Sequence, residues 1–174
     1  MLTLIIAIFA AATLSQGLAL YYAGRHQGEE YLESRKKRWL IHYIFNGIFW
    51  LVLLGLIIWM QFSARRIPVP AYLQFFGAAI ALAGSLLSSR SMAVLGLENA
   101  MGRRFFFPEE NPEIRTSVYS FLNNPMYDGF ILMFIGFGMG LGIAENFILA
   151  AVSMIFLNAG LASVENHRFR WNIF

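Results

Sequence analysis

Long apolar runs alternate with short polar segments along the whole chain. The first three runs cover residues 2–23, 39–62 and 71–97, and two shorter runs cover 126–142 and 147–164. A helix that crosses the hydrocarbon layer of a membrane needs about 20 mostly apolar residues, with a lower limit near 17. The pattern therefore predicts an all-α integral membrane bundle of about five transmembrane helices, the last two a short hairpin, forming a single domain over the 174 residues.

The composition narrows the class of protein further. Apolar residues make up 58% of the chain and charged residues 13%, whereas an average soluble domain is ~45–50% apolar and ~25% charged. The absence of cysteine excludes disulfides, thiolate catalysis and cysteine zinc sites. The three histidines are scattered, so no metal site is expected. His42 and Asn46 share one face of the second run, where hydrogen bonding is the simpler interpretation.

The basic residues predict the orientation of the bundle. Cytoplasmic loops are enriched in Lys and Arg. An outside N-terminus and an odd number of spans place eleven basic residues inside and leave only Arg65 and Arg66 outside. These charges indicate topology and lipid contact and not nucleic-acid binding. No basic segment precedes the first run, so a cleaved signal peptide is not expected. Three tryptophans near the ends of the runs are typical of an interfacial belt: Trp39, Trp59 and Trp171.

One sizeable segment, residues 98–124, lies between the runs. Its neighbouring Arg and Phe residues, from Arg103 to Phe107, suit either a segment in the head-group layer or an ordinary amphipathic connector. Arg90 follows Ala71 by 19 residues, which is about 29 Å along a helix. It therefore lies at the inner interface, where it either extends to the head-group region or contacts a lipid phosphate or a cofactor carboxylate.

Two polar clusters flank the last two runs. The first spans residues 123–129 and the second spans residues 165–168. Tyr127 precedes the short loop by about as many residues as separate Glu165 from it, so the two side chains should meet at the same inner face. Simpler interpretations exist for each residue: Asn124 is a good helix cap before a first-turn proline, and Glu165 suits an interfacial charge or a local pair with Arg168.

Glycines recur in the third and fourth runs. The fourth run holds two pairs of small residues four apart, Gly136/Gly140 and Gly138/Gly142, and Gly77 and Gly84 are one heptad apart in the third. Such spacing favours close helix packing. The alternative is a slot that admits a ligand.

The element Asn124-Pro125-Met126-Tyr127-x-Gly129, followed by a glycine-rich hairpin and by Glu165, resembles the phospholipid methyltransferase family over residues 71–169. The most similar branch is that of the phosphatidylethanolamine N-methyltransferases. The related isoprenylcysteine carboxyl methyltransferases carry Arg-His before the proline, where this chain has Asn123-Asn124.

The resemblance implies that S-adenosylmethionine binds within residues 71–174, between the last helices at the cytosolic face. Of the family's Gly-x-Gly in the third span, Gly84 is the second glycine and Leu82 replaces the first. Of its Glu-Glu pair, Glu165 is the first residue and Asn166 replaces the second. The cofactor-binding residues it implies are Gly84, Asn124, Pro125, Tyr127, Gly129, Glu165 and His167.

A reaction follows from this resemblance: transfer of a methyl group to a membrane lipid amine, phosphatidylethanolamine or a methylated derivative. The residues assigned to catalysis are Tyr127, Asp128 and Glu165, and the base that takes the ammonium proton is one of Glu165, Asp128, Glu98 or water. Arg90, Arg103 and Arg104 are assigned to the lipid phosphate.

The expected location is the endoplasmic reticulum of a eukaryote or the inner membrane of a bacterium. Two alternatives remain. One is an isoprenylcysteine carboxyl methyltransferase, and the other is a non-enzymatic relative, which the departures at Leu82 and Asn166 would suit.

Overall fold

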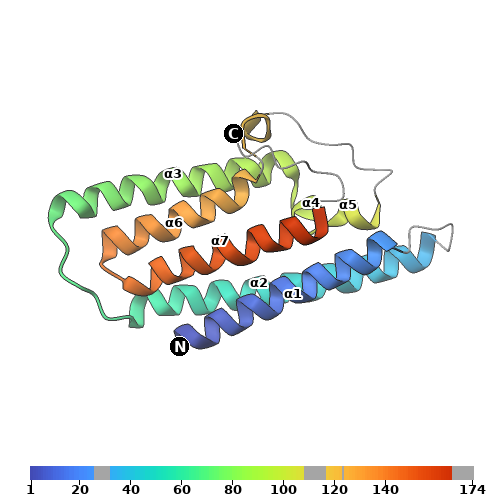
Figure 1. Ribbon diagram of the computed structural model, residues 1–174, viewed down its shortest axis with the longest axis horizontal. Helices are drawn as coiled ribbons and strands as arrows, with labels where there is room; N and C mark the ends of the chain where they lie inside the picture. The colour runs from blue at the N-terminus through green and yellow to red at the C-terminus, as the bar shows by residue number, and fades with distance from the viewer. Residues whose placement is uncertain (26–31, 108–116, 123, 166–174) are drawn as a thin grey trace.

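The computed structural model describes residues 1–25, 32–107, 117–122 and 124–165, with side chains except at 20–25, 32, 104–105 and 158–165. These residues form a helical bundle (Figure 1) whose helices, in chain order, are α1 (Leu2–Arg25), α2 (Leu32–Ser63), α3 (Ala71–Leu95), α4 (Leu97–Ala100), α5 (Arg103–Phe106), η2 (Ser117–Ser120), α6 (Pro125–Leu141) and α7 (Ala144–Glu165). All five predicted spans are helices. The main difference is that α2 begins seven residues early, since Lys and Arg are good helix formers and extend it beyond the apolar run.

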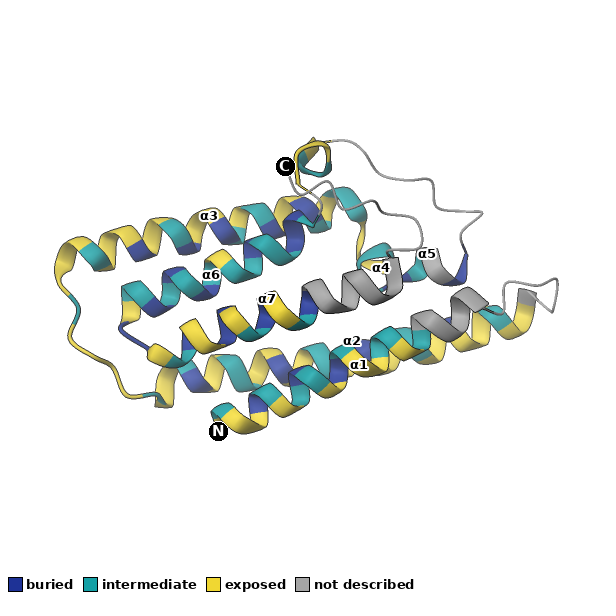
Figure 2. Ribbon diagram, in the orientation of Figure 1, coloured by how far each residue is buried: buried dark blue, intermediate teal, exposed yellow. Residues whose placement is uncertain are grey.

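Three of these helices, α1, α2 and α3, are long and apolar enough to cross a membrane, while α6 and α7 contain shorter apolar stretches. Many large apolar side chains are exposed on the outside of the bundle, and exposed positions recur along α1, α2 and α3 in Figure 2. Phe62 is 81% exposed and Phe75 is 80% exposed. A water-soluble monomer rarely exposes so much contiguous apolar surface, so the outer face is suited to lipid.

The α6–α7 hairpin is the central layer of the bundle. On one side α3 packs against α6, and on the other α1 packs against both α7 and α2 (Figure 1). The main core lies where α1, α2, α6 and α7 meet and includes Phe9, Leu53, Phe134 and Leu149. Each of the two outer layers therefore contacts a different helix of the hairpin.

The contact between α3 and α6 depends on glycine. A Cβ atom on Gly84 would lie 2.6 Å from the carbonyl oxygen of Gly129, and one on Gly136 would lie 2.6 Å from that of Gly77. Real Cβ atoms do not approach other atoms so closely, so the two backbones touch where these side chains are missing. The packing interpretation of Gly77, Gly84 and Gly136 is confirmed.

The turn between α6 and α7 is fixed by a glycine and by three hydrogen bonds to the rest of the bundle. Gly142 ends α6 in the left-handed conformation, with φ of 67°. Its carbonyl accepts a hydrogen bond of 2.8 Å from the backbone of Ile67. The fully buried Asn146 exchanges two side-chain hydrogen bonds with Gln61 of α2, 2.8 and 3.0 Å long. Paired amides of this kind join helices where no water is available.

The opposite end of the bundle gathers most of the basic residues. Three helices, α1, α3 and α7, end there, and two helices, α2 and α6, begin there (Figure 1). Arg35, Arg38, Arg90 and Arg103 belong to these helix ends, whereas Arg65 and Arg66 follow the other end of α2. The predicted segregation of charge between the two ends of the bundle is therefore present in the fold.

The connector after α3 differs from the expectation of a segment in the head-group layer. Phe106 and Phe107 are 6% and 1% exposed and form a small core with Trp39. The rings of Trp39 and Phe106 lie 5.5 Å apart between centroids. Trp39 is thus buried against the connector and is not exposed as a belt residue would be. Trp59 is 61% exposed, as a belt residue would be, and Trp171 lies outside the described residues.

We expect Gly136→Ala to destabilise the bundle by about 1–3 kcal/mol, because the added methyl group would meet the backbone of α3. Gly55→Ala in α2 is the matched control, since no atom lies within 4 Å of the position its Cβ would take. Thermal unfolding in detergent should show a lower midpoint for Gly136→Ala alone. Equal midpoints for the two variants would contradict the close α3–α6 contact.

Candidate active site

The first turn of α6 is shaped by its backbone. The carbonyl of Asn124 accepts hydrogen bonds from the N–H groups of Tyr127 and Asp128, 3.0 and 3.1 Å long. Pro125 occupies the first turn, as predicted, and is buried. Asn124 is the N-cap residue, but its side chain makes no capping hydrogen bond within the described part of the chain. Asn124 therefore occupies the capping position, but capping does not explain why its side chain is an amide.

Contacts from α3 fix this first turn in place. The hydroxyl of Ser88 donates a buried hydrogen bond of 2.8 Å to the carbonyl of Met126. One turn earlier on α3, Gly84 lies against the backbone of Gly129 and Met133. The structure thus brings together two residues predicted to bind the cofactor, Gly84 and Gly129. It accounts for both by helix packing, and a cofactor contact at either remains a prediction.

Tyr127 and Asp128 leave this turn in different surroundings. The Tyr127 ring is partly buried and packs against the main core. Asp128 is partly buried as well. Among the described residues, none forms a hydrogen bond or an ion pair with the Asp128 carboxylate. A carboxylate held partly out of water in this way is suited to binding a cation.

Glu165 is the last residue of α7, at the same end of the bundle as the start of α6 (Figure 1). The two helices are antiparallel neighbours joined by a turn of only two residues, so the predicted return of the chain is present. α7 has 22 residues and α6 has 17, so α7 extends beyond the start of α6 by a length of about 7 Å. The Glu165 side chain is not among those described, and Asn123, Asn166, His167 and Arg168 lie outside the described residues.

The three arginines predicted to hold a lipid phosphate are placed differently. Arg90 is exposed on α3, whereas its neighbour Ser91 and Ser88 are buried, so Arg90 lies off the face that packs on α6. Arg103 forms an ion pair with Glu98 and stacks over the Phe107 ring at 5.2 Å. The side chain of Arg104 is outside the described set. Their role in lipid binding stays a prediction.

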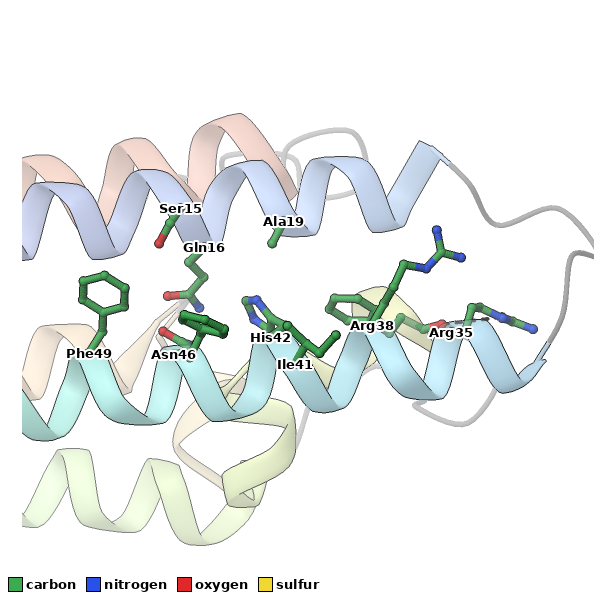
Figure 3. A pocket seen from close by; sticks show the side chains of 11 residues that line it. Ser15, Gln16, Ala19, Arg35, Arg38, Ile41, His42, Asn46 and Phe49 are labelled. Carbon is green, nitrogen blue, oxygen red and sulfur yellow. Dashed lines mark hydrogen bonds between the residues drawn. The ribbon is translucent and has the colours of Figure 1, made fainter.

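A cavity of about 380 Å³, which the sequence analysis missed, lies between α1 and α2 near α5 (Figure 3). Its lining residues come from these three helices: Ser15, Gln16, Ala19, Arg35, Arg38, Ile41, His42, Phe45, Asn46, Phe49 and Phe106. A sequence signal for it did exist. Polar residues recur at positions 35, 38, 42 and 46, which is one face of α2, and polar residues inside an otherwise apolar span usually face the interior of a bundle.

His42 and Asn46 hold the connector against α2. His42 Nε2 lies 3.1 Å from the carbonyl oxygen of Met101, and the amide nitrogen of Asn46 lies 3.4 Å from the sulfur of the same residue. The hydrogen-bonding interpretation of these residues is confirmed, with Met101 as the partner of both. Across the described residues, no group of three or more potential metal ligands occurs.

Comparison with known proteins identifies the protein family. The family model for phospholipid methyltransferases matches residues 72–170, which is more than half of the chain. The match includes α3, the connector, and the whole α6–α7 hairpin with both polar clusters. The chain therefore belongs to the phospholipid methyltransferase family. No curated protein and no solved structure matches it.

Membership implies methyl transfer to a phospholipid, with S-adenosylmethionine as the donor that the family uses. The charge at the start of α6 suits that cofactor, whereas the tight packing of α6 on α3 leaves no space for it. The partly buried Asp128 carboxylate fits its ammonium and sulfonium charges. The α3–α6 glycine contact does not admit it, because backbone atoms fill that space. A cofactor would have to lie beyond the contact, toward the end of α7.

We expect Ser88→Ala to lower the stability of the protein by about 0.5–1.5 kcal/mol, because the bond to the Met126 carbonyl is lost. Ser89→Ala, at the exposed neighbouring position, is the control and should leave the unfolding midpoint unchanged. The comparison is made by thermal unfolding in the same detergent. If the two substitutions had the same effect, the Ser88 bond would not hold the first turn of α6.

Proposed function

We propose that this protein transfers a methyl group from S-adenosylmethionine to the amine of a membrane phospholipid, phosphatidylethanolamine or one of its methylated derivatives. The reaction takes place where α6 begins and α7 ends. The observation that carries the proposal is the coincidence of two facts at one end of the bundle. The family match covers the hairpin, and the fold returns the end of α7 to the end of the bundle where Tyr127 and Asp128 lie.

Asp128 and Glu165 are assigned to binding the positively charged cofactor. Both are acidic, and the Asp128 carboxylate is uncommitted among the described residues. When bound, S-adenosylmethionine supplies a methyl group on a positively charged sulfur, ready for displacement. Methyl transfer needs the donor and the acceptor in line, so the contribution of the protein is mainly alignment. Tyr127, which packs against the main core, is assigned to contact that charge through its ring or its hydroxyl.

The lipid amine must lose a proton before it can attack. Of the candidate bases, Glu98 is already paired with Arg103, so its carboxylate is the least suited to accept a proton. Water, Asp128 and Glu165 remain, and the two carboxylates lie one on each helix of the hairpin. Either carboxylate belongs to the end of the bundle at which the lipid amine would bind, so either could take the proton.

The membrane face follows from charge. Basic residues gather at the end of the bundle that carries the site, and Arg65 and Arg66 lie at the other. The bias of Lys and Arg toward the cytoplasm supports a cytosolic site and an N-terminus on the opposite side of the membrane. The cofactor then enters from the cytosol, while the lipid arrives laterally within the bilayer.

The test is methyl transfer from radiolabelled S-adenosylmethionine by the purified protein in nanodiscs containing phosphatidylethanolamine. We expect labelled methylated lipid, and we expect Glu165→Gln and Asp128→Asn each to reduce the rate by about 100-fold or more. Glu145→Gln is the matched control, since Glu145 lies in the first turn of α7, at the opposite end of the helix.

The acceptor is tested in the same assay with mono- and dimethylated phosphatidylethanolamine and with a prenylated cysteine analogue. Labelling of the prenylated cysteine alone would overturn the lipid assignment. Equal loss of methyl transfer in Glu145→Gln and Glu165→Gln would contradict a site at the end of α7.

A further inference from the structure

The cavity between α1 and α2 is separate from the proposed methyl-transfer site. Apart from Phe106, its described lining residues all belong to α1 and α2, which precede the segment matched by the family model. Its volume, about 380 Å³, falls within the range of small-molecule sites. The cavity is therefore a feature of the N-terminal helices of this chain and calls for its own explanation.

Its lining changes character along α2. Arg35 and Arg38 lie toward one end and Phe49 toward the other (Figure 3). The 11 residues from Arg38 to Phe49 correspond to about 16 Å along the helix axis. Ile41 and Phe45 lie between them. The cavity is thus elongated along the helix, with charge at the end of the bundle and, toward its middle, apolar groups on α2 beside the polar Ser15, Gln16 and Asn46.

The apolar wall is accessible from outside the bundle. Ile41 and Phe45 are 49% and 62% exposed, on a helix long and apolar enough to cross a membrane. A ligand can therefore reach this wall from the hydrocarbon layer. By contrast, Asn46 is buried and bonded to Met101, so its amide closes the inner side of the cavity.

The charged end is built to hold an anion. The Arg38 guanidinium reaches the hydroxyl of Ser34 at 3.5 Å, a neutral partner that leaves its charge in place. The Arg35 guanidinium donates a hydrogen bond of 3.5 Å to the carbonyl oxygen of Phe106, and its central carbon lies 5.9 Å from the centre of the Phe107 ring, contacts that hold this group against α5. Guanidinium groups bind phosphate with directed, charge-assisted hydrogen bonds.

We propose that this cavity binds one glycerophospholipid, with its phosphate at Arg38 and Arg35 and the upper part of one acyl chain along Ile41, Phe45 and Phe49. A free phosphate would use only the charged end, and an uncharged diacylglycerol would use only the apolar wall. A phospholipid matches both, and it enters from the layer that surrounds the wall. The proposal does not depend on methyl transfer.

The experiment is native mass spectrometry of the delipidated protein, titrated with dioleoylphosphatidylglycerol, which has no amine for the proposed methyl transfer. We expect Arg38→Gln to weaken phospholipid binding by about tenfold, and Arg38→Lys to retain most of it. Lys37→Gln is the matched control, because it removes the same charge from the adjacent, exposed position of α2 outside the cavity. Ala19→Phe, which fills the cavity from α1, should also weaken binding.

Competition separates the possible ligands. An excess of dioleoylglycerol or of inorganic phosphate should displace little of the bound phospholipid. Displacement by inorganic phosphate together with no effect of Ala19→Phe would make the site an anion site and overturn the proposal. Equal weakening by Lys37→Gln and Arg38→Gln would reduce the effect to general surface charge and overturn it as well.

Discussion

The close contact between the backbones of α3 and α6 is the constraint on which the arrangement depends. Within lipid, helices gain little from hiding apolar side chains, so association must come from tight packing and hydrogen bonds. Gly77, Gly84, Gly129 and Gly136 remove the side chains that would keep the two axes apart. The Ser88 bond to Met126 then fixes the first turn of α6 against α3. The start of α6, which carries Tyr127 and Asp128, is therefore held in place by α3.

The α6–α7 hairpin connects the start of α6 to the α1–α2 half of the bundle. A two-residue turn with Gly142 reverses the chain, and the paired amides of Gln61 and Asn146 join α7 to α2 at the far end. Because α7 then runs antiparallel to α6, its last residue returns to the end of the bundle where α6 begins. The start of α6 and the last residue of α7, which are far apart in sequence, are thus brought to one end of the bundle by packing. A site made from helix ends suits a chain whose described residues form only helices.

Much of this arrangement is predictable from the sequence. The five apolar runs correspond to the long helices, because span length and composition are fixed by the membrane. The glycine spacing predicts the packed faces, and the similar lengths of the last two runs predict the return of the chain to the start of α6. In the structure α7 has 22 residues and extends beyond the 17-residue α6. These features depend on local periodicity and chain geometry, which a single sequence carries.

Features that depend on contacts between distant segments are not predictable in the same way. The burial of Trp39 against Phe106 requires the connector to fold back onto α2, and no local pattern encodes that return. The shared partner of His42 and Asn46, Met101, lies more than fifty residues away. The cavity between α1 and α2 arises from the spacing of two helices and the position of α5. Its polar face on α2 was visible in the sequence, but the space beside that face was not.

The measurement that tests the account most directly is calorimetric binding of S-adenosylmethionine to the folded protein in detergent, wild type against Asp128→Asn. The account predicts a saturable binding isotherm for the wild type, and its loss or strong weakening in the variant, with the unfolding midpoint of the variant unchanged. Absence of binding by a wild-type protein that is shown to be folded would contradict it, and so would identical binding by the two proteins.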